Sequence, residues 1–257
     1  MYDIIGSIVL YKTNIKDLEK VIQSFFNTKL NVKLYLSDNS PTRELENYIL
    51  DLHNENIEYV FNNKNGGYGY GHNIILNMVK EKAKYFLVLN PDIYFDYGVL
   101  DNIFDYMEKN AMIGQLMPRV ENENGELQYL CKRYPTLSNL FIRRFCPFKN
   151  IVKRTNYFYE MHDKDYNSIM EVPLLSGCFM FLRMNILAKI NGFDTNFFMY
   201  FEDYDLCRRM SSYSKIIYYP KVRIVHKHEK SSYKNKKMLI EHIKSTIRYY
   251  IKWYLRK

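Results

Sequence analysis

The chain has few cysteines, few glycines and prolines, and no long apolar run. Only four cysteines occur in its 257 residues and no two have CxxC spacing, which excludes a disulfide scaffold and argues against structural zinc. With 10 Gly, 7 Pro and 47% hydrophobic residues, collagen-like and disordered chains are excluded as well. No segment approaches the roughly 18 apolar residues of a membrane-spanning helix, and residues 1–12 lack the features of a signal peptide. We therefore expect an ordered cytoplasmic protein with reduced, mostly buried cysteines.

Acidic residues are too few to balance the basic ones, and the net charge is +9. Residues 231–257 hold eight Lys or Arg against the single acid Glu241, a net charge of +7, so the first 230 residues carry only +2. A nucleic-acid-binding protein needs cationic surface spread along a groove. The charge distribution therefore argues against a nucleic-acid partner, although a binding module built on the basic segment and the many aromatics stays as an alternative.

The basic C-terminal segment has two sets of periodic residues. The apolar set is Leu239, Ile243, Ile247, Tyr250, Ile251 and Tyr254, and the basic set is Lys244, Arg248, Lys252 and Arg256. This pattern predicts a basic amphipathic helix. Two interpretations stay open and are compatible: a helix docked on the domain with a solvated cationic face, and a helix attached to an anionic membrane surface.

Short apolar runs alternate with helical patterns along most of the chain. The predicted strands are Ile4–Tyr11, Val32–Leu36, Ile57–Phe61, Tyr85–Leu89, Gly177–Arg183 and Lys215–Tyr219. The predicted helices are Asn14–Phe26, Arg43–His53, Asn73–Lys82, Ile186–Ile190 and Glu202–Met210. Between Gln115 and Met170 the periodicity is weak, and we expect only a strand pair around Asn124 and Gly125. This order predicts an α/β fold with a mostly parallel sheet, in one domain over residues 1–230, followed by the tail 231–257.

Polar residues follow each of the first four predicted strands, where ligands bind in open parallel sheets. These residues are Tyr11, Asp38, the glycine-rich loop 62–71 and Asp92. They suit a nucleoside diphosphate: Tyr11 can stack on a base, Asp38 can accept from a pyrimidine N3–H, and Asp92 can bind a divalent ion. In the loop, Gly67, Gly69 and Gly71 alternate and so depart from GxGxxG spacing, which disfavours a nicotinamide enzyme and leaves a simple tight turn as the alternative.

Three carboxylates, Glu202, Asp203 and Asp205, follow an aromatic run. Crowded carboxylates raise one another's pKa, as is typical of catalytic sites. The alternative is an acidic first helical turn in which Arg209 pairs with Asp205. His226 is either structural or joins Asp92 on a metal ion.

Taken in order, these segments resemble glycosyltransferase family 2. The matching segments are the first strand to Tyr11, Asp38-Asn39-Ser40, the loop with Asn65, Gly67, Tyr68, Gly71 and Asn73, Leu89-Asn90-Pro91-Asp92, Ser176 to Met180, Asn191 to Asp194, Phe198 to Arg209, and His226 with Ser231. Within the family the chain is most similar to bacterial dTDP-rhamnosyltransferases of O-antigen and related polysaccharide synthesis, with which it also shares Arg133 to Ser138 and Ile243 to Tyr249.

The resemblance implies a GT-A fold, with a Rossmann-like nucleotide-sugar-binding half over residues 1–114 and an acceptor half over residues 115–230. It implies inverting transfer of L-rhamnose from dTDP-β-L-rhamnose to a saccharide linked to undecaprenyl diphosphate, at the inner face of the cell membrane. Another dTDP-sugar or UDP-sugar donor is the alternative. An inactive family member that serves as a partner in a polysaccharide complex is disfavoured, because Asp92 and Asp203 are intact.

The resemblance also assigns roles to single residues. It makes Asp203 the general base, with Glu202 or Asp205 orienting it or binding the acceptor. Nucleotide-binding residues would be Tyr11, Asp38, Asn65, Gly67, Tyr68, Gly71 and Asn73, and donor or acceptor contacts would come from Gly177, Arg133 and Arg209. Asp92 and His226 would hold Mg²⁺ or Mn²⁺. Because Asn90 and Pro91 precede Asp92, the usual DxD motif keeps only its last carboxylate, which leaves the strictness of the metal requirement open.

Overall fold

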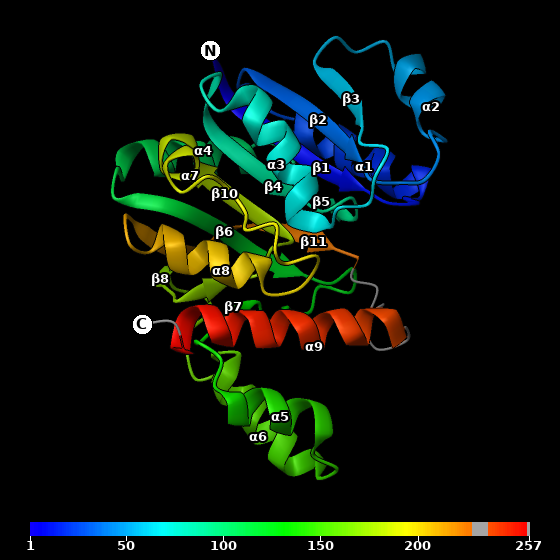
Figure 1. Cartoon of the computed structure of the whole chain (residues 1–257). Coiled ribbons are helices and arrows are strands. Elements are labelled where there is room, and N and C mark those ends of the chain that lie inside the picture. Colours follow the sequence, from blue (N-terminus) through cyan, green and yellow to red (C-terminus); the bar gives the residue numbers. More distant parts are fainter. Residues whose placement is uncertain (228–235, 256–257) are drawn as a thin grey trace.

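A computed structural model describes residues 1–227 and 236–255 of the protein. Its core is a mixed sheet with strand order β3-β2-β1-β4-β10-β6-β11-β5, and β8 pairs with β11 beside this path. Helices cover both faces of the sheet (Figure 1). The expected α/β fold is thus confirmed. The division between residues 114 and 115 falls inside β6, so the two predicted halves share one continuous sheet.

The N-terminal half is a βαβαβαβ series, as the alternating pattern predicts. Its parallel strands are β1 (Tyr2–Leu10), β2 (Val32–Asp38), β3 (Ile57–Phe61) and β4 (Ala83–Leu89), connected by α1 (Ile15–Phe26), α2 (Glu46–Asp51) and α3 (Tyr68–Val79). Asn14 begins α1 by accepting the backbone N–H of Lys16. Strand β1 is buried from Ile4 to Ile8, as expected for a strand covered by helices on both faces.

The rest of the chain adds both antiparallel and parallel strands. Its elements are β5 (Ile93–Tyr94), α4 (Val99–Lys109), β6 (Ile113–Glu121), β8 (Met170–Glu171), β10 (Phe179–Arg183), α7 (Met184–Lys189), α8 (Glu202–Met210) and β11 (Lys215–His226). Strand β10 is antiparallel to both β4 and β6. A second small sheet pairs β7 (Cys131–Lys132) with β9 (Leu174–Leu175). Three of the four cysteines, Cys131, Cys178 and Cys207, are buried.

Two sequence predictions about local structure were wrong. Helix α3 begins at Tyr68 and not at Asn73, because part of the glycine-rich segment is helical: a Cβ on Gly69 would lie 2.7 Å from Phe193, so the glycines allow close packing of this first turn. The strand pair around Asn124 and Gly125 is reduced to a turn with one bridge between Glu121 and Leu127.

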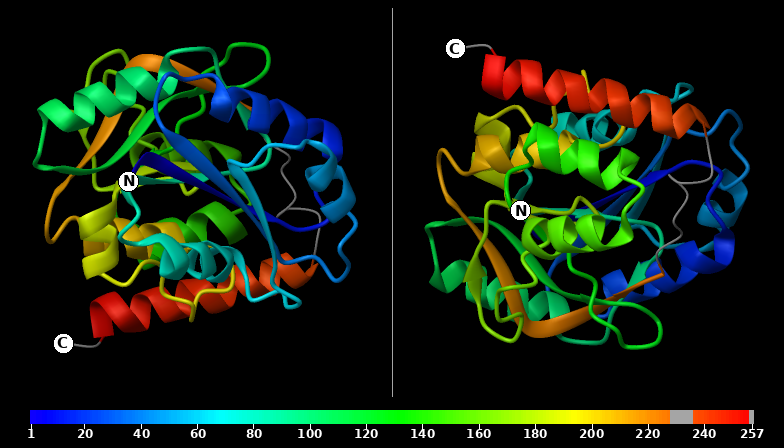
Figure 2. Two further views of the ribbon diagram at one scale, coloured as in Figure 1. Left: turned by 90° about the horizontal axis from the view of Figure 1, so that it is seen from above. Right: turned by 90° about the horizontal axis from the view of Figure 1, so that it is seen from below.

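A helical hairpin occupies the stretch in which the sequence pattern was too weak to place elements. Helices α5 (Leu137–Phe145) and α6 (Lys149–Tyr159) pack against each other. They project from the lower side of the molecule and lie beside the C-terminal helix in both Figure 1 and the right-hand view of Figure 2. We call this unit the α5–α6 hairpin.

The C-terminal segment is helical, as predicted, and forms α9 (Lys236–Tyr250) with a π-helical end over Ile251–Leu255. It crosses the lower side of the sheet domain, next to α8 (Figure 1). Ser245 and Tyr249 are fully buried, but Ile243, Ile247 and Ile251 are 40%, 54% and 38% exposed. Of the apolar stripe that the periodicity predicts, Tyr250 is therefore docked, whereas these three isoleucines face outward. The expected domain boundary at residues 230 and 231, and Ser231 itself, lie outside the described residues. No helix among the described residues is both long and apolar enough to cross a membrane.

Candidate active site

The central strands bring Asp92 and Gly177 to the same edge of the sheet. Phe179, which begins β10, pairs with Leu89, which ends β4. Just beyond this pair, the N–H of Asn90 donates to the carbonyl of Cys178 over 2.9 Å. Segments almost ninety residues apart in the sequence are thereby joined where β4 ends.

Asp203 lies in the first turn of α8 and is held by backbone donors. Its Oδ2 accepts the N–H of Gly177 and its Oδ1 accepts the N–H of Tyr204, each at 2.9 Å. The chain enters this helix through Tyr200 and Phe201, whose φ values of 68° and 67° are uncommon for bulky residues. Burial raises the pKa of the Asp203 carboxyl to about 6. Asp203 is therefore an acid whose charge changes near neutral pH.

Glu202 lies next to Asp203 and is only 6% exposed. Burial, and then the charge of Asp203, raise the pKa of Glu202 well above its usual range. Both carboxyls line a small cleft of about 150 Å³, which we call the acid cleft. Its other lining residues are Arg143, Tyr159, Tyr200, Phe201, Tyr204 and His242. The acid cleft thus lies between α8, the α5–α6 hairpin and α9.

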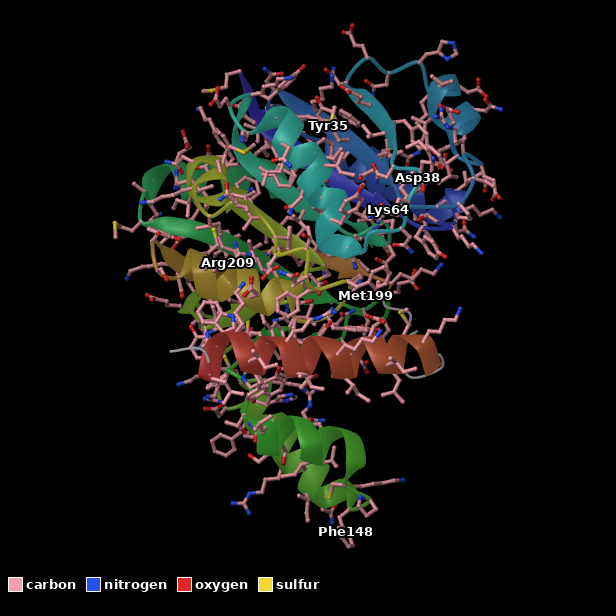
Figure 3. The ribbon with its side chains drawn as sticks, in the orientation of Figure 1. Tyr35, Asp38, Lys64, Phe148, Met199 and Arg209 are labelled. Carbon is pink, nitrogen blue, oxygen red and sulfur yellow. The ribbon has the colours of Figure 1, made fainter. Side chains whose placement is uncertain are left out.

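A larger cleft of about 1120 Å³ lies on the glycine-loop side, and we call it the donor cleft. Its lining includes Tyr11, Lys12, Asn39, Asn65, Gly66, Gly67 and Tyr68 from the N-terminal half. The opposite wall includes Met199, Lys237, Glu241, Lys244 and Arg248; Figure 3 labels Met199 just above α9. Gly67 has φ of +98°, and a Cβ there would lie 2.1 Å from the carbonyl oxygen of Phe198, so this turn requires glycine.

Tyr68 connects the two clefts. Its ring lines the donor cleft, and its hydroxyl lies 2.7 Å from the carbonyl oxygen of Gly177 and 2.9 Å from Oδ1 of Asn90. Because the N–H of Gly177 donates to Asp203, a single peptide segment separates Tyr68 from the acid. Burial raises the pKa of Tyr68 well above its usual range, so the hydroxyl keeps its proton and acts as a donor.

Asp92 and His226 form a pair of potential metal ligands. Nε2 of His226 lies 3.5 Å from Oδ1 of Asp92. The side-chain amide of Gln128 donates to the carbonyl of His226 and to Asn122, so its oxygen faces Nδ1 of His226 at 3.1 Å and orients Nε2 toward Asp92. Within residues 1–227 and 236–255 no group of three ligating side chains occurs. A carboxylate with one imidazole fits Mg²⁺ or Mn²⁺ that takes its remaining ligands from a diphosphate and water.

Three predicted nucleotide-binding residues shape the donor cleft without lining it. Asp38 is fully buried, and its two oxygens accept the N–H of Ser40 and the hydroxyl of Tyr59, each at 2.7 Å. Gly71 packs against Val9. Asn73 exchanges two hydrogen bonds with the backbone of Phe193 and so holds the loop before α8.

The structure places Asp205, Arg209 and Arg133 away from both clefts. Asp205 is fully buried and pairs with Arg209 at 2.7 Å, in the (i, i+4) arrangement considered as the structural alternative. The Arg209 guanidinium also donates to the carbonyls of Ile190 and Gly192. Arg133 forms a two-pronged ion pair with Asp163.

Sequence reasoning missed the residues that the α5–α6 hairpin and α9 bring to the clefts. Arg143 and Tyr159 come from the stretch of weak periodicity, Lys244 was assigned only to a basic helical face, and Lys237 was only counted in the charge of residues 231–257. In the sequence, only the lack of acids beside Arg143 could have drawn attention to this segment.

The arrangement of strands and helices is the GT-A fold, which glycosyltransferases have. Similar solved structures are GalNAc-T7 with UDP, GalNAc and Mn²⁺ (TM-score 0.65, 13% identity, 88% of this chain and 43% of that chain) and S. aureus TarS (TM-score 0.61, 13% identity, 88% and 37%). At such identities the likeness shows the fold alone, and the chain spans less than half the length of either protein.

More narrowly, the chain belongs to glycosyl transferase family 2, which matches residues 8–201. It is 28% identical over 243 residues to rhamnosyltransferase WbbL of Escherichia coli (strain K12), covering 90% of this chain and 87% of that protein. It is 24% identical over 226 residues to the N-acetylglucosaminyl-diphospho-decaprenol L-rhamnosyltransferase of Mycobacterium tuberculosis (strain H37Rv), covering 81% and 71%. The resemblance drawn from the sequence is confirmed.

Proposed function

We propose that the enzyme transfers L-rhamnose from dTDP-β-L-rhamnose, with inversion, to a lipid-linked saccharide of cell-surface polysaccharide synthesis. The carrying observation is Asp203, an acid with a pKa of about 6 that is fixed one peptide segment from the donor cleft. The names of the two relatives support rhamnose as the sugar. The name of the mycobacterial relative supports an acceptor that carries a lipid diphosphate.

In the proposed reaction, Asp203 takes the proton of the acceptor hydroxyl. General bases act over about 2.6–3.2 Å and work best when their pKa lies near the operating pH. As the proton moves to Asp203, the acceptor oxygen bonds to the anomeric carbon, and the bond from that carbon to the diphosphate oxygen breaks. The bonding electrons leave with dTDP. Attack from the face opposite the leaving group inverts the anomeric centre.

Asp92 and His226 are the residues proposed to hold the divalent ion, which would neutralise charge on the departing diphosphate. The rest of the donor is assigned to the donor cleft. Tyr11 is 51% exposed there and is placed to stack on the base, while Asn65, Gly67 and Tyr68 form the wall along the sugar and phosphates. Asp38 accepts hydrogen bonds from Ser40 and Tyr59, and the neighbouring Asn39 donates from its side chain to the carbonyl of Gly67 in this wall.

The acceptor is assigned to the acid cleft, where Tyr159 and Tyr204 can bind a sugar and Arg143 can bind an anionic group. A lipid-linked acceptor requires the enzyme to work at a membrane surface. We propose peripheral association with the inner face of the cell membrane, to which the basic residues of α9 contribute.

A panel of nucleotide sugars tests the proposal. Thermal stabilisation and donor hydrolysis are measured with dTDP-rhamnose, dTDP-glucose, UDP-glucose, UDP-N-acetylglucosamine and UDP-galactose, each with Mg²⁺, Mn²⁺ or EDTA. We expect a selective response to dTDP-rhamnose that a divalent ion increases. A response to a UDP-sugar alone would overturn the donor while keeping the family and the base. Silence across the panel would overturn the catalytic proposal.

A further inference from the structure

The α5–α6 hairpin ends in apolar side chains that no described part of the chain covers. Phe148, at the turn between the helices, is 65% exposed, and Figure 3 shows it at the far tip, pointing away from the body. Ile151, in the first turn of α6, is 48% exposed, and Tyr157 and Phe158, at the other end of α6 toward the body, are 48% and 57% exposed. Exposed apolar groups gathered on one projecting unit mark an interaction surface more often than single exposed residues do.

The same hairpin is strongly basic. Residues 137–159 contain five Lys or Arg and no acid. With +5 here and +7 in residues 231–257, the chain's net charge of +9 leaves −3 for everything else. Lys149, Lys153 and Arg154 are exposed around the apolar tip. An apolar tip ringed by cations fits a surface that is anionic outside and apolar beneath.

Helix α9 extends this surface. Its exposed stripe of Ile243, Ile247 and Ile251 lies opposite the face that carries buried Tyr249. The hairpin is fixed to α9, because the hydroxyl of Tyr250 donates to the carbonyl of Pro135, just before α5, over 2.6 Å. The two basic, apolar elements are therefore in contact at this point.

The acid cleft opens between these two elements. Arg143 and Tyr159 come from the hairpin, His242 comes from α9, and Asp203 lies between them. An acceptor whose lipid tail stays in a bilayer would reach Asp203 only if both elements lie at the bilayer surface.

We propose that the tip of the α5–α6 hairpin inserts into a bilayer that contains anionic phospholipids, beside α9, and so aims the acid cleft at the membrane. A second copy of this chain is a poorer occupant, because two tips of the same strong positive charge repel each other. The inference rests on the proposed function only for the identity of the acceptor. The insertion itself is inferred from the exposed apolar side chains of the hairpin and from its positive charge.

Cys146 offers a probe at the tip, because it is partly exposed while Cys131, Cys178 and Cys207 are buried. A polarity-sensitive fluorophore on Cys146 of the full chain is titrated with vesicles of phosphatidylethanolamine and phosphatidylglycerol, and with vesicles of phosphatidylcholine alone. We expect a blue shift with the anionic vesicles, weakened by salt. If anionic vesicles bind the protein but the emission of the fluorophore does not shift, the proposed insertion is overturned.

Phe148→Ser combined with Ile151→Ser tests the side chains themselves. Each substitution removes apolar surface that the proposal buries in the bilayer, so we expect vesicle affinity to fall at least about tenfold. Leu50→Ser is the matched control, because Leu50 is also 65% exposed but lies on α2 at the opposite end of the molecule. Unchanged vesicle binding by the double variant would refute the proposal. It would also be refuted if sedimentation showed that the wild type forms a dimer without lipid and that the double variant does not.

Transfer to a short water-soluble acceptor separates this inference from the proposed function. The double variant should keep wild-type turnover with that acceptor and lose turnover only with lipid-linked acceptor in vesicles. If the wild-type enzyme transfers no sugar from any donor, the proposed function fails, and the vesicle measurements still decide whether the hairpin inserts.

Discussion

Oδ2 of Asp203 accepts a hydrogen bond from the backbone N–H of Gly177, and the carbonyl of Gly177 faces the hydroxyl of Tyr68. One peptide segment thus contacts the proposed base with its donor group and the wall of the donor cleft with its acceptor group. Because Gly177 leads directly into β10 in the centre of the sheet, the position of Asp203 is set by rigid structure. Such positioning is what a base needs if it is to meet the acceptor hydroxyl without reorganising.

Replacing Asp203 with Asn should lower turnover by about 10²- to 10⁴-fold, because the amide cannot accept the acceptor proton. The affinity for dTDP should stay within a few fold, since Asp203 lines the acid cleft and not the donor cleft. Single-turnover transfer and nucleotide titration measure the two effects. Glu202→Gln is the control: burial raises the pKa of Glu202 well above its usual range and so favours the neutral acid that Gln resembles, and this change should lower turnover less. Wild-type turnover by Asp203→Asn would remove Asp203 from the role.

The activity should depend on the ionisation of Asp203. Because the general base must be deprotonated, kcat/KM should fall as the pH drops through about 6, and this limb should vanish from the residual activity of Asp203→Asn. A limb centred near the ordinary carboxyl pKa would contradict the raised value.

The free energy of unfolding should also depend on the ionisation of Asp203, but it should fall as the pH rises, whereas the activity falls as the pH drops. The pKa of Asp203 is about 6 in the folded protein against 3.8 ordinarily, so the folded state binds the proton more tightly. The resulting stability is fully present below about pH 4 and is lost as the pH rises through 6. Asp203→Asn has no such carboxyl. Its free energy of unfolding should therefore rise relative to that of the wild type by roughly 3 kcal/mol or less between these pH values. Urea unfolding at several pH values measures the difference, and a constant difference would contradict it.

The sequence predicts the fold well where the hydrophobic periodicity is strong and where contacting segments are close in the sequence. The α8 bounds were predicted as Glu202–Met210 because acids begin that helix and apolar residues repeat along it. The α5–α6 hairpin could not be placed, because several of its apolar residues face outward and give no stripe toward a core. For the same reason, the periodicity of the C-terminal helix groups Tyr250, which is buried, with three isoleucines that are exposed.

Local sequence pattern points to the acids of the candidate site, but it does not predict most of the contacts that these acids make. Asp203 and Asp92 follow strand ends or begin helices, so local pattern locates them. The burial of Asp38, and the pairing of Asp205 with Lys252 from the π-helical end after α9, depend on segments far apart in the sequence. No spacing rule in a single sequence contains that information.

A divalent ion should strengthen dTDP binding through Asp92. We expect Mg²⁺ or Mn²⁺ to raise the thermal stabilisation that dTDP gives to the wild type, and EDTA to remove the increase. Asp92→Asn should bind dTDP alike with and without the ion. Asp96→Asn is the control, since Asp96 is exposed four residues further on. An equal metal response in Asp92→Asn and the wild type would contradict the assignment.

Docking of α9 should depend on Lys252, whose Nζ lies 2.6 Å from Oδ1 of the fully buried Asp205 and 2.7 Å from Asp194. Lys252→Met leaves Asp205 with Arg209 and the indole N–H of Trp253. Because a buried carboxylate loses one of its cations, the free energy of unfolding should fall by roughly 1–3 kcal/mol. Lys244→Met is the matched control on the same helix: its ion pair with Glu241 is exposed and should contribute less than about 1 kcal/mol. Chemical denaturation of both variants checks this, and equal losses would mean that the buried pair does not hold the helix in place.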